Sequence, residues 1–157
     1  FYNGKKNGIG SYMWEDNSKY EGDIKNNFFH GYGVYIYSDG RKYCGQWNNN
    51  HINGFGEVTW IEGNKYSGFY KNNQKDGLGI YYSPKDFIYI GFWKKGKQEG
   101  FGKYICKDII QYGIWKNGKL LKMFENENEI NNNINVSNYK YAIFKWDINK
   151  LKNFLGL

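Results

Sequence analysis

The sequence predicts an all-β repeat protein, built from short units that each contain two strands and two turns. Three observations lead to this prediction: paired glycines that recur every 23 residues, aromatic residues that keep the same spacing, and turns rich in Asn and Gly between them. A strict period of this length is typical of repeat architectures, in which each unit contacts only its neighbours. We therefore expect one elongated domain rather than a globule.

The paired glycines have the clearest period. Their members stand two residues apart, and the pairs are Gly8 and Gly10, Gly31 and Gly33, Gly54 and Gly56, Gly77 and Gly79, and Gly100 and Gly102. Glycine weakens a strand unless another group lies close over its bare backbone. We therefore expect aromatic rings of one strand to lie over both glycines of a pair on its neighbour, so that stacked units bury a ladder of rings.

Two aromatic columns supply these rings. A tyrosine opens four units, at Tyr20, Tyr43, Tyr66 and Tyr89, a glycine follows two residues later, and a large apolar residue comes two residues after that. Because side chains alternate along a strand, these three positions share one face. The predicted structural framework is therefore Gly31, Gly33, Trp47, Gly54, Gly56, Gly77, Gly79, Trp93, Gly100, Gly102 and Trp115.

Two kinds of turn close each unit. Asn and Gly tolerate the positive φ that two-residue type I′ turns require, so residues 25–27, 48–50, 71–73 and 116–118 are predicted hairpin turns. The segments between them are rich in Tyr, Ile, Val and Trp, which favour strands. A second loop, as at residues 38–40, completes each unit.

The pattern Tyr-x-Gly-x-Trp-x-x-Gly, closed by Gly-x-Gly, resembles the MORN repeat (membrane occupation and recognition nexus). Residues 43–56 and 89–102 are clear copies, and the resemblance runs from residue 1 to about 120. Ile24 and Tyr70 stand where Trp is usual, and Gln111 where Tyr is usual. The resemblance implies one β-hairpin per repeat, stacked into a single long, twisted antiparallel sheet, and it supplies no catalytic residue.

We expect three segments: five to six MORN repeats in 1–120, the first and last partial, a polar linker in 121–138, and a small C-terminal capping segment in 139–157. The cap is expected to be a strand, a short helix or both. The alternative for 139–157 is a segment that docks on a second chain or leads into a following domain. Because the chain begins inside a repeat, we interpret it as a fragment of a longer protein with more repeats before it.

Basic charge is concentrated near the end of the repeats. Residues 89–122 carry eight lysines against two carboxylates, within a net charge of +7 for the chain. In the expected sheet, Lys94, Lys95 and Lys97 lie at one turn and Lys116 and Lys119 at the next. This basic edge is a candidate site for anionic lipid headgroups, at ~1 kcal/mol per lysine, or for an acidic protein segment. The alternative is a solvated turn without a partner.

Other function classes find little support. The single arginine, Arg41, argues against nucleic acid as a partner, and the aromatic residues are already needed for packing. The histidines His30 and His51 have no partner at a ligand or triad spacing, so we expect no catalytic residue, metal or cofactor. The cysteines Cys44 and Cys106 fall at non-equivalent positions of different repeats, which favours free thiols in a reducing cytosol.

These observations predict a non-enzymatic scaffold or interaction module that presents a repeat sheet to protein partners and associates with a membrane through its basic end. We expect a cytoplasmic protein at the membrane periphery or cytoskeleton, with a homodimer as one partner option. The alternative is a targeting or regulatory MORN segment of a larger enzyme, such as a lipid kinase or methyltransferase. Frequent Asn, Lys, Ile and Tyr suggest an AT-rich coding genome, as in some protists.

Overall fold

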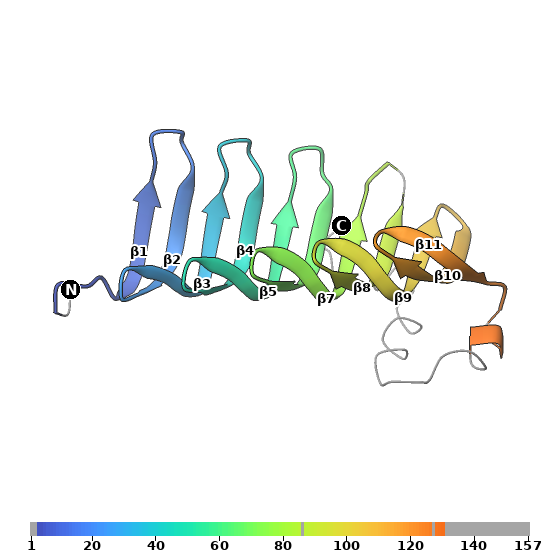
Figure 1. Ribbon diagram of the computed structural model, residues 1–157. Helices are drawn as coiled ribbons and strands as arrows, with labels where there is room; N and C mark the ends of the chain where they lie inside the picture. Colours follow the sequence, from blue (N-terminus) through green and yellow to red (C-terminus); the bar gives the residue numbers. More distant parts are fainter. Residues whose placement is uncertain (1–2, 86, 127, 131–157) are drawn as a thin grey trace.

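The computed structural model describes residues 3–85, 87–126 and 128–130. Within these ranges the chain forms one open antiparallel sheet of eleven strands that follow one another in sequence order (Figure 1). This confirms the predicted all-β fold class and its elongated single-layer sheet of hairpins. The strands are β1 (Gly8–Met13), β2 (Lys19–Lys25), β3 (Phe28–Ile36), β4 (Lys42–Asn48), β5 (His51–Thr59), β6 (Lys65–Lys71), β7 (Gln74–Tyr82), β8 (Ile88–Lys94), β9 (Lys97–Cys106), β10 (Ile109–Lys116) and β11 (Lys119–Phe124).

Every repeat bends at the same place. The pairing of β2 with β3 shifts register between Gly22 and Ile24, and β4–β5, β6–β7 and β8–β9 shift at the equivalent positions. Such a β-bulge bends the strand and increases its twist. Figure 1 shows the resulting bend, with the lower part of each hairpin turned away from its upright part.

The bulge gives the first glycine of each pair a role that differs from the expected one. Gly31, Gly54, Gly77 and Gly100 have φ values of 72°, 102°, 102° and 86°, a region that favours glycine. They allow the backbone to make the bulge and do not lie beneath a ladder tyrosine. They recur with the same period as the second glycines, but glycine is needed here for its backbone conformation and not to make room for a ring.

The second glycine of each pair lies beneath a tyrosine ring, as the sequence predicts. A Cβ added to Gly33 would meet ring atoms of Tyr20, and the same holds for Gly56 with Tyr43, Gly79 with Tyr66 and Gly102 with Tyr89. Each hydroxyl donates to the backbone oxygen three residues further along, over 2.7 Å for Tyr20 and 3.3 Å for Tyr89. All four tyrosines are fully or almost fully buried. We call the face that carries them the ladder face.

The Asn and Gly turns have the predicted backbone. Both central residues have positive φ, for example 47° and 67° at Asn49 and Asn50. The second residue also bonds to the preceding repeat, because the Asn50 N–H donates to the Phe29 oxygen over 3.0 Å. Where Asn is present, its side chain adds a second bond: Oδ1 of Asn50 accepts the Phe29 N–H over 2.8 Å.

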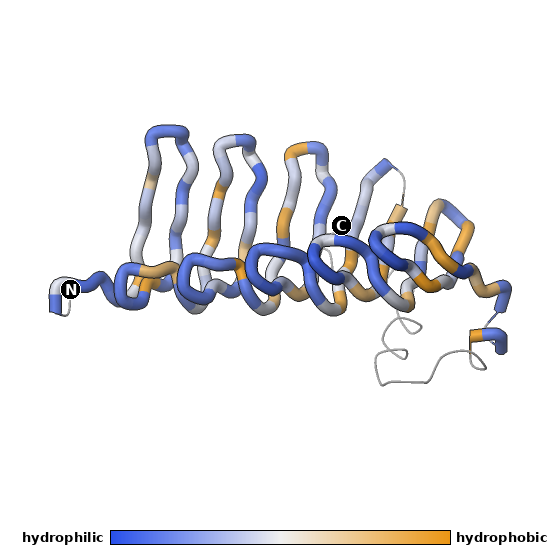
Figure 2. Tube along the Cα trace, viewed as in Figure 1, coloured by the Kyte–Doolittle hydropathy of each residue, from blue (hydrophilic) through white to orange (hydrophobic). Residues whose placement is uncertain are grey.

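Two apolar clusters stabilise the sheet. The larger one follows the ladder face from Tyr20 to Trp115. The second lies on the opposite face, which we call the outer face, and contains Ile80, Ile90 and Phe101. Figure 2 shows hydrophobic positions becoming more frequent toward the C-terminal repeats.

The sheet extends beyond residue 120. Strand β11 extends to Phe124, so its last residues belong to the sheet although they fall in the segment 121–138. A helical turn at 128–130 follows and buries Ile130 completely. The expected capping segment, 139–157, lies outside the described residues.

Candidate interaction surfaces

The basic edge is exposed on two neighbouring hairpin turns. Lys94 ends β8 and Lys97 begins β9, with Lys95 in the turn between them. Lys116 and Lys119 flank the next turn in the same way. All five side chains are exposed. One carboxylate lies among them, because Glu99 accepts a hydrogen bond from the Asn117 N–H over 2.9 Å.

The outer face changes from exposed to buried along the sheet. The residue between the paired glycines is 85% exposed at Ile9, 59% at Tyr32 and 37% at Phe55, half-buried at Leu78 and only 8% exposed at Phe101. These positions are equivalent in the repeat, so the change reflects what surrounds each repeat and not the local backbone. The N-terminal repeats therefore present a row of large apolar side chains to solvent.

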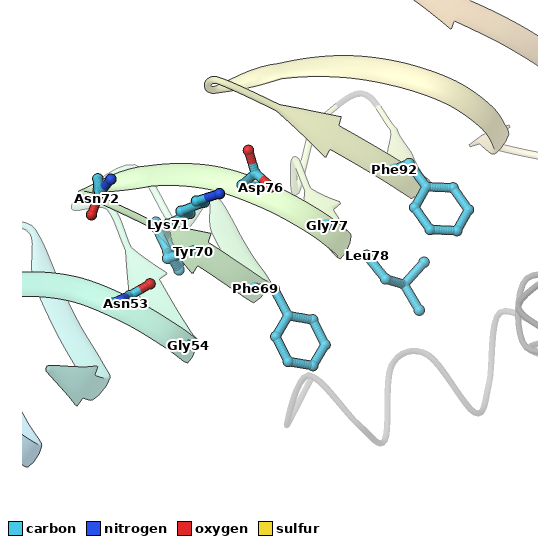
Figure 3. A pocket seen from close by; sticks show the side chains of 10 residues that line it. All are labelled: Asn53, Gly54, Phe69, Tyr70, Lys71, Asn72, Asp76, Gly77, Leu78 and Phe92. Carbon is cyan, nitrogen blue, oxygen red and sulfur yellow. The ribbon is translucent and has the colours of Figure 1, made fainter. Parts of the chain in front are cut away.

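A hollow of about 600 Å³ lies within this row, between β5 and β8 (Figure 3). Phe69, Leu78 and Phe92 project from the sheet on one side of the hollow, and Lys71 and Asp76 lie toward the other side. Phe69 replaces the polar residues that earlier repeats have in this column, Asp23 and Gln46, whose side chains accept hydrogen bonds from the backbone at the bulge.

A second cavity, of about 230 Å³, lies on the ladder face. Its walls come from Tyr37 and Arg41 near one long loop, Trp60 near the next, and Tyr70 and Lys75 near the Asn and Gly turns. The sequence pattern did not identify Tyr70, Lys75 or Arg41 as site residues. A signal was present for Lys75, because its column holds Phe29 and Ile52 in the two preceding repeats, although Lys6 stands there in the first.

The framework tryptophans belong to the ladder. Trp47, Trp93 and Trp115 are buried, and each packs edge-on against a ladder tyrosine. The indole N–H groups of Trp47 and Trp93 donate to the oxygens of Gly33 and Gly79 over 3.2 Å. These residues are therefore committed to packing and offer little to a partner.

Chemically active groups are sparse. In the described ranges, no three His, Cys, Asp or Glu side chains come together in a way that would hold a metal ion. Both cysteines are free thiols. Among the described residues, no helix has the length and hydrophobicity to span a bilayer.

The hairpins, the tyrosine ladder and the regular bulge define the chain as a β-hairpin repeat protein. The MORN repeat model matches residues 1–19, 20–40, 43–65, 66–86 and 89–108. The chain therefore belongs to the MORN-repeat family, whose repeats are interaction and membrane-binding modules. Both fold and family are those of a non-catalytic repeat module. A search of curated proteins found no significant match.

Proposed function

We propose that the chain is a scaffold module that binds a protein partner through the outer face of its sheet. The observation that supports this proposal is the row of exposed apolar residues Ile9, Tyr32 and Phe55, together with the exposed Phe69, whose ring centre lies 5.7 Å from that of Phe55. Asp23 and Gln46 separate the first three of these side chains, and the apolar surface is continuous from Phe55 to Phe69. Exposed apolar patches mark interaction sites. The hollow beside Phe69 offers this row a concave anchor point, and aromatic anchors in such hollows dominate binding energy at interfaces.

A pull-down from the native cell tests this proposal. The bait is the chain itself, and the variant is Tyr32→Ser, Phe55→Ser and Phe69→Ser together. The matched control is Ile61→Ser with Ile109→Ser, because these side chains are 72% and 60% exposed but lie outside the row. Proteins lost from the row variant and kept by the control support the proposal. Capture that is the same with both variants contradicts it.

A second function, association with an anionic membrane, is favoured by the basic edge. Five exposed lysines on two adjacent turns would gain about 1 kcal/mol each near a negatively charged bilayer. The protein would then lie at the membrane periphery, with its sheet free to hold a partner.

Liposome co-sedimentation tests the membrane proposal. We expect binding to vesicles with anionic lipid and little to neutral vesicles, and a strong loss when Lys94, Lys95 and Lys97 become Glu. The control carries Glu at three exposed lysines from the other end of the sheet: Lys19, Lys25 and Lys42. An equal loss in both variants would point to net charge alone and would contradict a specific edge.

A further inference from the structure

The cavity on the ladder face contains a cation in an aromatic setting. The Lys75 Nζ lies 4.7 Å from the ring centre of Trp93, 4.9 Å from Tyr66, 5.1 Å from Tyr81 and 5.4 Å from Trp60. Among the residues that the structure describes, no carboxylate pairs with it. Aromatic faces stabilise an ammonium ion but leave its N–H groups without acceptors. Burial lowers the pKa of Lys75 to about 8.

One of the residues that line the same cavity carries a buried hydroxyl without a partner. Tyr70 occupies the column of Trp47 and Trp93, but its Oη has no hydrogen-bond partner in the described part of the chain. Tyr70 is only 7% exposed. A buried hydroxyl without a hydrogen-bond partner carries a desolvation penalty, so such a group is unusual unless a water, an ion or a ligand satisfies it.

Tyr70 and Lys75 come from adjacent strands and line the same cavity. They are directly paired across β6 and β7, on the same side of the bulge, and both line the cavity. Burial raises the pKa of Tyr70 well above its ordinary value, so its hydroxyl stays protonated and can donate. Two residues of the cavity lining therefore carry donors, an ammonium and a hydroxyl, and Tyr37 and Trp60 supply aromatic walls beside them.

The charge balance favours a ligand with one negative charge. Arg41 also lines the cavity, but its Nε donates to the Asp39 carboxylate over 2.8 Å, which offsets its charge. Lys75 is thus the cation that a ligand must balance. A carboxylate carries one charge and accepts hydrogen bonds at two oxygens, whereas a phosphate would bring more charge than this cavity compensates.

We propose that this cavity binds a carboxylate on a short apolar stem, with Lys75 Nζ and Tyr70 Oη donating to its oxygens. The aromatic walls contact the stem. An acidic side chain of a partner protein and a free organic acid share this chemistry. The first source deepens the scaffold function and rests on it, because it would give the partner a recognition point on the ladder face.

The site is tested by titrating the purified chain with butyrate and recording the NMR signals of the Lys75 side chain. We expect a saturable shift at Lys75, and a rise in its pKa as the carboxylate stabilises the ammonium form. Affinity should fall as pH rises through about 8, because deprotonation removes the cation. A shift at Lys75 no larger than at the exposed Lys71 would overturn the proposal.

Matched variants separate the site from general charge effects. Lys75→Met keeps an apolar stem in the aromatic setting and removes the cation, so we expect at least a tenfold loss of affinity. Tyr70→Phe removes only the hydroxyl and should weaken binding roughly threefold to tenfold, in line with one hydrogen bond. Lys71→Met should leave binding unchanged. Binding that survives Lys75→Met with unchanged affinity overturns the proposal.

Further probes identify the source of the anion. A capped alanine pentapeptide with a central glutamate, compared with its glutamine version, represents a partner protein. Binding of the glutamate peptide but not of its glutamine version supports protein recognition. Butyrate binding without binding of the glutamate peptide supports a site for free acids. Inorganic phosphate that binds more tightly than butyrate overturns the carboxylate assignment. These probes need no partner protein, so the two proposals are tested independently. The pull-down can fail while the cavity binds butyrate, and the cavity can fail to bind while the pull-down succeeds.

Discussion

At the scale of single residues, the ladder depends on the absence of a Cβ at particular glycines. Tyr66 lies over Gly79 and is held from its other sides by Tyr70 and Trp93, whose ring centres lie 5.1 and 5.3 Å away. The ring is fully buried and has no space to move. Gly96 differs, because nothing lies near its Cβ position and only its φ of 83° favours glycine.

Gly79→Ala and Gly96→Ala should therefore destabilise the protein for different reasons. For Gly79→Ala we expect a loss of about 1–3 kcal/mol or more, because the new methyl would lie 2.6 Å from Tyr66 ring atoms. For Gly96→Ala we expect about 1 kcal/mol from backbone strain alone. Urea unfolding measures both, and equal losses would contradict the assigned causes.

Lys75 makes stability depend on pH. Its pKa is about 8 in the folded chain and near 10.5 when unfolded, so the unfolded state binds more protons between these values. Stability should therefore rise as pH increases from about 8 toward 9.5. Lys75→Met should remove this rise and stabilise the chain at pH 7 by about 1–3 kcal/mol, because burial of the ammonium is costly while the rings offset part of that cost.

The measurement is urea unfolding of both chains at pH 7 and pH 9.5. Comparing the two chains at each pH cancels the contribution of every group that both chains share. A variant whose stability changes with pH as much as the wild type does would show that Lys75 is not the responsible group.

At the scale of the hairpin, each Asn turn links its repeat to the one before. Oδ1 of Asn27, Asn50 and Asn73 accepts the backbone N–H of Lys6, Phe29 and Ile52 over 2.7–2.8 Å. Gly96 and Gly118 occupy the same position without this side chain, so only the backbone bond remains there. The sequence predicts the turn from its positive φ, but the bond to the preceding repeat appears only once the register is known.

Asn50→Gly should cost about 1 kcal/mol, because it keeps the backbone and removes one hydrogen bond. Gly118→Asn should stabilise by a similar amount, since the new side chain would accept the Gln98 N–H as Asn50 accepts that of Phe29. Thermal or urea unfolding checks both changes. A destabilising Gly118→Asn would show that the last repeat departs from the geometry of the others.

At the scale of the whole molecule, the outer face of the last repeats carries a buried apolar cluster. Ile88, Ile90 and Ile105 lie on β8 and β9 with exposures below 5%. The chain enters this cluster at Ile130, and residues 139–157 are rich in apolar side chains. The expected capping segment would therefore matter for one face of the sheet as well as for its last edge.

Deletion of residues 139–157 tests the cap. We expect lower solubility and increased binding of a hydrophobic dye, because the apolar outer face of the last repeats would become accessible. Size-exclusion chromatography and dye fluorescence measure these effects. A well-folded monomer that replaces a dimer would instead assign the segment to an interface between chains.

Much of this architecture can be predicted from the sequence, because a single repeat period determines where the strands and turns lie. The hairpins, the turn backbone and the burial of Tyr43 and Trp47 on one face are all local or periodic features. The bulge at Gly31 could not be predicted. Both glycines of a pair recur with the same period, but the first allows the bulge and the second makes room for a tyrosine ring. The setting of Lys75 combines rings from three strands and a loop, so it depends on register and curvature that no single segment encodes.

The order of the strands also determines how the molecule responds to force. The strands run across the long axis, so their hydrogen bonds point along it, and β1 and β11 lie at opposite ends. A pull between these ends places all strand pairs in series, and the force acts along the hydrogen bonds, so a strand pair opens one bond after another. The sheet should therefore peel open hairpin by hairpin at low tension and extend progressively, as a compliant tether would.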